Sequence, residues 1–292
     1  YTKKRPFVQN SPILIVTFYA PGTGHEADLE RLTCPNKRGY AAANGYDFIN
    51  AFEHDDLQDE YVRNYNMNPN KTPQMFKLRL LPLLMTTYGY EWVMWSDADA
   101  IFLNWLHPLE PHLDARFDVI FATNSPAHPT KALMINSGHF FVRNCAWSIS
   151  FLYQCYGLSF VDCWEFMQEK RPFNEHYNLC PSRNKRLFQD QLILQYFITY
   201  TPHDLFGCHF KHVDLYHFDS EFPDYSFGDM VVHIAGYPVA RKAVLLDALL
   251  KACDCASGAC DITDNPELTP IKNPTRTPQH LYEPFNRECT KK

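Results

Sequence analysis

Short runs of consecutive apolar residues are the clearest pattern along the chain. The first, 13–19 (ILIVTFY), is almost entirely apolar and has the length of one buried strand. Further strands are predicted by the runs at 46–52, 92–95, 118–123, 139–142 and 230–234. Continuous rather than alternating apolar residues are typical of parallel strands that are covered on both faces.

The segments between these runs predict mainly helices. Helices are expected at 36–45, 74–88, 146–156 and 189–200, the first ended by a glycine and the second kinked at Pro82. Residues 53–74 are rich in Asn, Asp and Pro, so we expect a long loop there. Strands that alternate with helices predict an α/β fold with a mostly parallel central sheet flanked by helices.

The two ends of the chain differ in composition from its centre. Residues 1–12 are polar with two prolines and are expected to form an arm or the end of a stem. Residues 13–250 form one predicted domain, and 251–292, rich in Pro and Cys, an irregular tail packed on it. No run of about 18 apolar residues is present, so membrane attachment would require an anchor outside this chain.

Charge and cysteine content narrow the class of protein. The formal net charge is −6 with no long basic block, which argues against a nucleic-acid partner. Ten cysteines are typical of an oxidising compartment with several disulfides. We expect Cys253, Cys255 and Cys260 to staple the tail, with a zinc site as the alternative. A glycosylation sequon at Asn70 is weakened by the proline that follows it.

The strongest chemical signal is Asp97-Ala98-Asp99, directly after the apolar run WVMW. Ligands of open α/β sheets bind at the carboxyl ends of strands, and this pair of carboxylates would lie there. Two hard oxygen ligands favour Mg²⁺ or Mn²⁺, which could neutralise a diphosphate leaving group. The alternative is a solvated turn, because this short pattern often arises by chance.

A histidine ends the last predicted strand. In His233-Ile234-Ala235-Gly236 the imidazole could supply a third metal ligand, and imidazole suits Mn²⁺ better than Mg²⁺. The glycine would let the backbone approach a phosphate closely. A purely structural role is the alternative, since the chain has 13 histidines.

Two further polar groups interrupt apolar segments. Asn136-Ser137-Gly138 could hydrogen-bond sugar hydroxyls, or could form a simple turn. Asp190-Gln191 begins a predicted helix, where Asp190 could instead cap that helix.

Taken in order, these patterns resemble the retaining GT-A-fold glycosyltransferases, the group that includes glycogenin. The stretches EWVMWSDADAIF, MINSGHFFVRN and HIAG are most similar to the galactosyl-, mannosyl- and xylosyltransferase family of fungi and plants. The similarity covers roughly residues 12–240, and it is strong only in the patterns themselves. In glycogenin-like enzymes a lysine follows the H-x-x-G glycine closely, whereas here the nearest cations are Arg241 and Lys242.

The resemblance implies a metal-dependent hexosyl- or pentosyltransferase of the secretory pathway. Its donor would be a nucleotide-sugar, with UDP favoured and GDP as the alternative, and its acceptor a glycan or glycoprotein. The metal would be Mn²⁺, with Mg²⁺ as the alternative. The location would be the Golgi lumen, as the ectodomain of a type II membrane protein, or outside the cell.

The resemblance also assigns residues to the site. The metal ligands would be Asp97, Asp99 and His233. Donor-binding residues would be Thr17, Phe18, Tyr19, Asp97, Ala98, Asn136, Ser137, Gly138, Gly236 and Lys242. Asp190 would stabilise oxocarbenium-like charge near the anomeric carbon, and Gln191 would orient the sugar. Transfer would then retain the α configuration of the donor.

The sequence is compatible with three other classes of protein. Gly22-x-Gly24-x-x-Ala27 fits the letter of a dinucleotide fingerprint, but a helix from this point would soon meet Pro35. An aspartyl-phosphate phosphatase would want Thr or Ser shortly after Asp99, where the chain has Ala100-Ile101-Phe102. A catalytically inactive glycan-binding or scaffold protein on the same fold is the third alternative.

Overall fold

The structure is a computed structural model. Of the 292 residues it describes 9–19, 26–67, 72–123, 135–158, 189–200, 208–214, 218–223, 225–226, 229–261 and 265–268. The sequon asparagine, the glycines of the dinucleotide-like pattern, most of the expected N-terminal arm and most of the tail lie outside the described residues.

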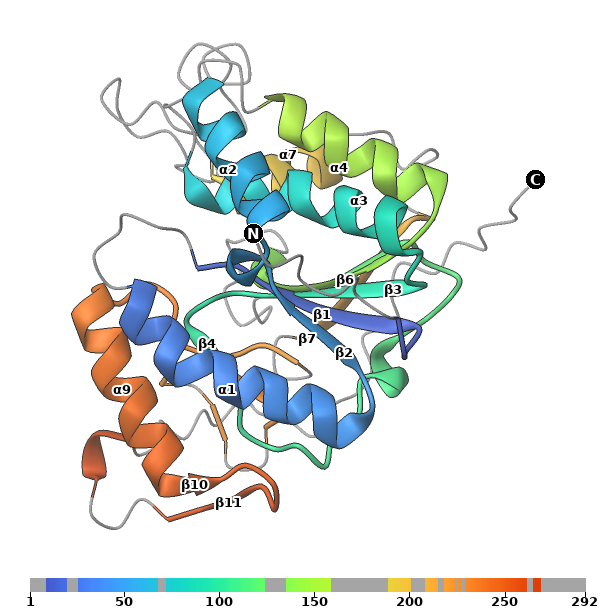
Figure 1. Ribbon diagram of the computed structural model, residues 1–292. Helices are drawn as coiled ribbons and strands as arrows, with labels where there is room; N and C mark the ends of the chain where they lie inside the picture. Colours follow the sequence, from blue (N-terminus) through green and yellow to red (C-terminus); the bar gives the residue numbers. More distant parts are fainter. Residues whose placement is uncertain are drawn as a thin grey trace.

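The centre of the molecule is a six-stranded sheet with the order β2-β1-β3-β6-β5-β7 (Figure 1). Its strands are β1 (Ile13–Thr17), β2 (Asp47–Asn50), β3 (Trp92–Ser96), β5 (Val119–Thr123), β6 (Ile135–Arg143) and β7 (Phe210–Asp214). Strand β6 runs antiparallel to both of its neighbours, and the other five strands share one direction. The predicted α/β fold with a mostly parallel sheet is therefore confirmed.

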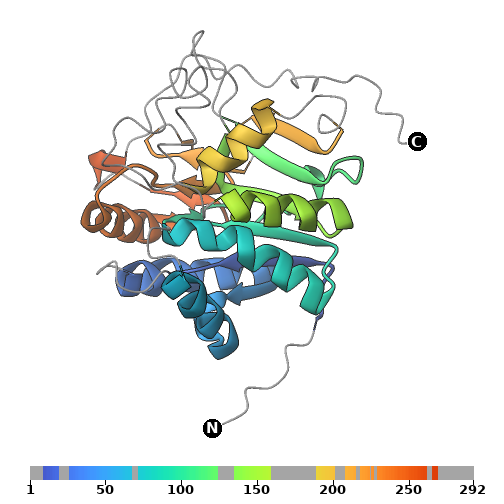
Figure 2. The same cartoon turned by 90° about the horizontal axis from the view of Figure 1, so that it is seen from above.

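Helices cover both faces of this sheet. One face carries α2 (Asp55–Met67), α3 (Lys77–Tyr88), α4 (Ala146–Leu158) and α7 (Asp190–Tyr200), and the other carries α1 (Glu26–Asn44) and α9 (Val239–Ala252) (Figures 1 and 2). Short 3-10 turns lie at Ala51–Glu53, Pro73–Phe76, Glu110–His112 and Pro266–Leu268. None of the described helices is long and apolar enough to cross a lipid bilayer.

A second, three-stranded sheet lies on the α1 and α9 side of the large sheet (Figure 1). Its strands are β4 (Ala100–Phe102), β9 (Val231–His233) and β8 (Ser220–Glu221), with β9 in the middle. Strand β4 follows β3 after only three residues, Asp97 to Asp99. The chain thus passes from the large sheet to the small one at the carboxylate pair.

The core explains the continuous apolar run at the start of β1. Leu14 and Val16 pack into the layer formed with α2, α3, α4 and α7, whereas Ile13 and Ile15 pack into the layer on the other face. Successive side chains of a strand point to opposite faces, so a sheet buried on both sides needs an apolar residue at every position.

Two helices differ from the prediction. Helix α1 begins at Glu26 rather than 36 and runs through Pro35, which lies on its exposed side. Leu29, Leu32 and Tyr40 of the same helix are buried, and their packing outweighs the backbone hydrogen bond that the proline removes. The predicted loop at 53–74 is also wrong, because α2 occupies most of it and buries Leu57 and Tyr61, four residues apart.

The described cysteines are only partly paired. Cys253 and Cys260 form a disulfide that closes the hairpin of β10 (Cys253–Asp254) and β11 (Ala259–Cys260), and Cys208 is also disulfide-bonded. The expectation that Cys255 helps to staple the tail is wrong. Its thiol is free and buried, it accepts a hydrogen bond from Asn36, and burial raises its pKa to about 11.

Candidate metal and donor site

The three side chains predicted to bind a metal lie together. Asp97 and Asp99 are in the turn between β3 and β4, and His233 is the last residue of β9. One ligand atom from each lies within 4.8 Å of the other two. His233 Nε2 is 3.2 Å from Asp99 Oδ1 and 3.9 Å from Asp97 Oδ2.

Backbone pairing fixes these three residues relative to each other. Ala100, next to Asp99, lies opposite His233 in the β4–β9 ladder, and the Ile234 amide donates to the Asp99 carbonyl at 3.0 Å. The Asp97 amide donates to the Gly138 carbonyl at 2.8 Å, which ties the turn to β6. The site is therefore built on ladders of both sheets rather than on a free loop.

The charged groups of this cluster shift one another's pKa strongly. Burial alone would lower the pKa of His233, but the carboxylates of Asp99 and Asp219 raise it well above its usual value. Burial alone would raise the pKa of Asp99, but His233 and Lys242 hold it far below its usual value. Lys242 Nζ contacts Asp99 Oδ2 directly.

A buried lysine joins the carboxylate pair to Asp190. Lys77 Nζ lies 2.9 Å from Asp97 Oδ1, 2.8 Å from Asp190 Oδ2 and 3.0 Å from the Ser137 carbonyl. Burial alone would lower the pKa of Lys77, but Asp190 and Asp97 raise it above its usual value. Asp190 and the metal cluster, far apart in sequence, are therefore parts of one charged network.

Sequence reasoning missed Lys77, although a signal was present. It is the first residue of α3, where the helix dipole disfavours a cation. A lysine at this position is locally disfavoured, and in the structure Asp97 and Asp190 stabilise it, although the sequence position does not identify these partners.

A second buried lysine contacts the turn that carries Asp97 and Asp99. Lys37 of α1 donates to the Asp97 carbonyl at 2.6 Å and to Thr17 Oγ1 at 3.3 Å. Burial lowers its pKa to about 8, although Asp99 and Asp97 oppose that change. The side chains of Thr17, Phe18 and Tyr19, predicted to bind the donor, are themselves buried.

The Asn136-Ser137-Gly138 segment lies inside β6 rather than in a turn. Gln191 Oε1 accepts from the Ser137 amide at 3.3 Å and from the Ser137 hydroxyl at 3.4 Å. Asn136 donates to Glu221 at 2.7 Å and accepts from the Gly138 amide at 2.7 Å. These contacts bring the two pairs of predicted sugar-binding residues side by side next to Asp97.

The remaining predicted donor residues are close in sequence to the predicted metal ligands. Gly236 lies in the turn after β9 with φ of 76°, a left-handed conformation that favours glycine. Ala98 lies between the two carboxylates, and its carbonyl accepts from Thr33 at 2.8 Å.

The donor set fits a divalent cation. Two carboxylates and one imidazole are ligands that Mn²⁺ accepts, and three protein ligands leave positions open for phosphate or water oxygens. The Asp97 and Asp99 side chains are 25% and 13% exposed, so the cluster opens to solvent on one side. Four carboxylates, those of Asp97, Asp99, Asp190 and Asp219, are opposed here by the ammonium groups of Lys37, Lys77 and Lys242.

Comparison with known proteins gives two kinds of likeness. The chain is 33% identical over 85 residues to "Probable glycosyltransferase 6" of Oryza sativa subsp. japonica, covering 28% of this chain and 16% of that protein. It is 24% identical over 160 residues to "Glycosyltransferase 6" of Arabidopsis thaliana, covering 54% of this chain and 32% of that protein. The matched stretches thus span less than a third of these relatives, and no family model matches the chain.

Among solved structures, the chain is similar to a glycosyltransferase involved in the glycosylation of the major capsid of PBCV-1. The TM-score is 0.52 with 16% sequence identity, and the alignment covers 80% of this chain and 98% of the other. This likeness establishes the architecture: the chain has the α/β fold of GT-A glycosyltransferases.

Proposed function

We propose that this chain is a metal-dependent glycosyltransferase that moves a sugar from a nucleotide-sugar, with UDP favoured, to a glycan or glycoprotein acceptor. One observation carries the proposal. Asp97 and Asp99, in the turn between the two sheets, and His233, at the end of β9, converge to within 4.8 Å at the edge of a GT-A fold where strands end. A cation held there, Mn²⁺ or alternatively Mg²⁺, would neutralise charge on the departing diphosphate.

Lys242 is assigned to the diphosphate. It now contacts Asp99 Oδ2, a position that a cation would take over. Released from Asp99, its ammonium group would be free to pair with a phosphate oxygen. The turn at Gly236 would let the backbone approach the same phosphates.

The other side of the cluster is assigned to the sugar. Gln191, Ser137 and Asn136 offer amide and hydroxyl groups for sugar hydroxyls. Gln191 is hydrogen-bonded to Ser137, and Asn136 to the Gly138 amide. Asp190, held by Lys77, would stabilise positive charge at the anomeric carbon. This placement supports transfer with retention of the α configuration, with the diphosphate taking the proton of the acceptor.

Two alternatives are weaker. A dinucleotide-binding sheet of the dehydrogenase type is parallel, whereas here antiparallel β6 separates β3 from β5. The prediction that Pro35 would end a helix beginning near the glycine pattern is wrong, because α1 runs through this proline. An inactive glycan-binding protein on the same fold would bind nucleotide or glycan without turnover.

We infer that the protein works in the secretory pathway, in the Golgi lumen or outside the cell. The disulfide between Cys253 and Cys260, together with the bonded Cys208, supports an oxidising compartment.

The proposal is tested by thermal unfolding with UDP, GDP and NAD, each with Mn²⁺ or with EDTA. A ligand at about 100 times its Kd stabilises by about 2.7 kcal/mol. We expect stabilisation by UDP that requires Mn²⁺ and is absent in Asp99→Asn. Asp247→Asn, at an exposed carboxylate of α9, serves as the matched control and should behave as the wild type. Stabilisation by NAD instead, or no nucleotide effect, would contradict the proposal.

A further inference from the structure

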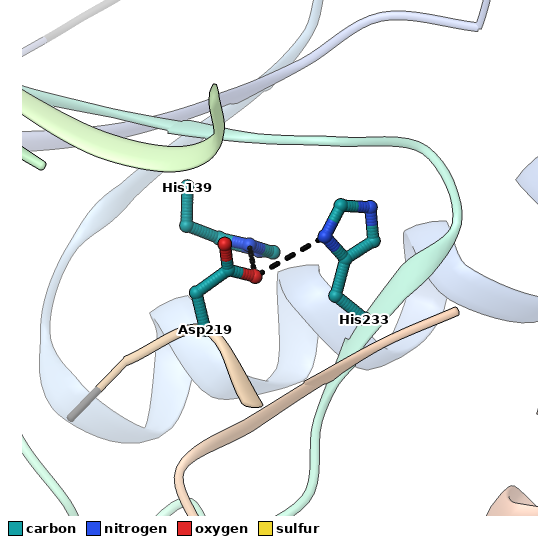
Figure 3. A group of neighbouring side chains, drawn as sticks. All are labelled: His139, Asp219 and His233. Atoms are coloured by element: carbon teal, nitrogen blue, oxygen red, sulfur yellow. Dashed lines mark hydrogen bonds and ion pairs between the residues drawn. The ribbon is translucent and has the colours of Figure 1, made fainter. Parts of the chain in front are cut away.

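Behind the candidate metal site lies a buried carboxylate between two histidines. Asp219, directly before β8, is fully buried, and its Oδ1 lies 2.7 Å from His139 Nδ1 and 3.2 Å from His233 Nδ1 (Figure 3). His139 belongs to β6 of the large sheet, and His233 to β9 of the small one. One oxygen atom thus connects the two sheets at the point where they build the site.

The two ring nitrogens of His233 face different partners. Its Nε2 faces Asp99 and Asp97, so Nε2 is the atom that would bind a cation. A metal-binding nitrogen needs a free lone pair, which places the ring hydrogen on Nδ1. Nδ1 lies 3.2 Å from Asp219 Oδ1, and an N–H donated to that carboxylate would keep this tautomer and hold the ring plane.

His139 also connects Asp219 to the residue that precedes the carboxylate pair Asp97 and Asp99. His139 Nε2 lies 3.0 Å from the hydroxyl of Ser96, the residue immediately before Asp97. His139 can donate through Nδ1 to Asp219 and accept through Nε2 from Ser96, so its two ring nitrogens both have partners. The positions of His233 and of the Asp97 turn are therefore linked through side chains as well as through backbone.

We propose that Asp219 is a positioning residue that fixes the tautomer and orientation of His233, with His139 and Ser96 holding Asp219 in place. This inference rests on the proposed function, because it assigns Asp219 to the second layer of the metal site. Partners of this kind typically contribute about 10- to 100-fold to metal affinity.

A separate metal ion between His139, Asp219 and His233 is the competing explanation, because their ligand atoms also lie within 4.8 Å of one another. Two observations weigh against it. Asp219 and His139 have no exposed surface, so an ion would be enclosed without open positions. His233 would also have to bind two cations at once, through Nδ1 and Nε2.

The test measures Mn²⁺ binding to the full chain in the presence of UDP. Electron paramagnetic resonance distinguishes free from bound Mn²⁺ and serves as the readout. The variants are Asp219→Ala, which removes the acceptor, and Asp219→Asn, which keeps an oxygen acceptor but loses the charge. Asp118→Ala is the matched control, because Asp118 is a buried carboxylate that also contacts a histidine Nδ1, that of His209, at the start of β5. The spin-echo modulation from coordinated imidazole nitrogen reports directly on His233.

We expect one Mn²⁺ per wild-type chain, a 10- to 100-fold loss of affinity in Asp219→Ala with weakened nitrogen modulation, and a smaller loss in Asp219→Asn. Asp118→Ala should lower the melting temperature without changing Mn²⁺ affinity. Wild-type affinity in both Asp219 variants, or a second Mn²⁺ that Asp219→Ala removes, would overturn the inference. If the wild type itself bound no Mn²⁺, the proposed function would fail instead. Should Asp219→Ala not fold, Asp219→Asn and His139→Phe, which removes the contact from the other side, carry the same comparison.

Discussion

Substituting alanine for Gly138 should push His233 out of the metal site. Gly138 lies in β6 with no unusual backbone conformation, so the strand itself accepts alanine. A Cβ atom at this position, however, would lie 2.2 Å from His233 Cε1 and 2.5 Å from His233 Nδ1. The imidazole thus lies directly against the glycine, and this contact is the reason that a glycine is needed here.

The size of the effect follows from these distances. Ordinary van der Waals contact begins at 3.4 Å, so the ring and the strand must separate by at least 1.2 Å, the difference between 3.4 and 2.2 Å. Metal–ligand bonds tolerate only about 0.2 Å. Loss of a second-layer partner costs up to about 100-fold in metal affinity, so displacing the ligand itself should cost at least that much. Overpacking should also destabilise the fold by about 1–3 kcal/mol.

Calorimetric titration of the protein with Mn²⁺ in the presence of UDP measures the loss of metal affinity, and thermal unfolding measures the loss of stability. Gly157→Ala in α4 is the control, since a Cβ there meets nothing within 4 Å and both readouts should stay near the wild type. Adding His233→Ala to Gly138→Ala removes the overlap, so stability should recover while Mn²⁺ binding stays lost. Wild-type Mn²⁺ affinity in Gly138→Ala would refute the reasoning.

Three further predictions concern Asp190, the configuration of the product and the buried carboxylate of Asp118. Asp190→Asn should lower turnover by about 100-fold or more with less effect on donor affinity, which steady-state kinetics would measure; equal loss in both would indicate a binding role. The anomeric configuration of the product, read by NMR, should match the α-linked donor, and a β-linked product would contradict the role of Asp190. Burial alone would raise the pKa of Asp118, but Arg143 and His209 hold it below its usual value. Wild-type chain should therefore be more stable than Asp118→Asn above about pH 5, and this advantage should disappear as pH falls through the lowered pKa; an advantage unchanged by acid in denaturant unfolding would argue against it.

The sequence predicted the sheet well because burial on both faces leaves a local signal. Every position of a run such as 13–16 is apolar, and the run can be recognised without knowledge of its neighbours. Helices α1 and α2 were harder to predict, because each contains residues that disfavour a helix locally. These residues are Pro35 in α1 and several Asn and Asp residues in α2. Packing of one face of each helix stabilises it in the fold.

The metal cluster was accessible for a similar reason, whereas its supports were not. Asp97, Asp99 and His233 each follow or end an apolar run, so their place at the strand ends could be inferred. Lys37, Lys77 and Asp219 lie elsewhere in the sequence and reach the site only through tertiary packing. A charged residue that the fold buries completely can be recognised from sequence only when its partners are already known.

The central claim is tested most directly by measuring the nucleotide released from a panel of UDP- and GDP-sugars with glycan acceptors. We predict that at least one donor releases its nucleotide diphosphate when Mn²⁺ is present, that EDTA abolishes the release, and that Asp99→Asn shows none. Release that persists in EDTA or in Asp99→Asn would contradict the metal site. Mn²⁺-dependent nucleotide binding without release from any donor would contradict the claim that this chain is an active transferase.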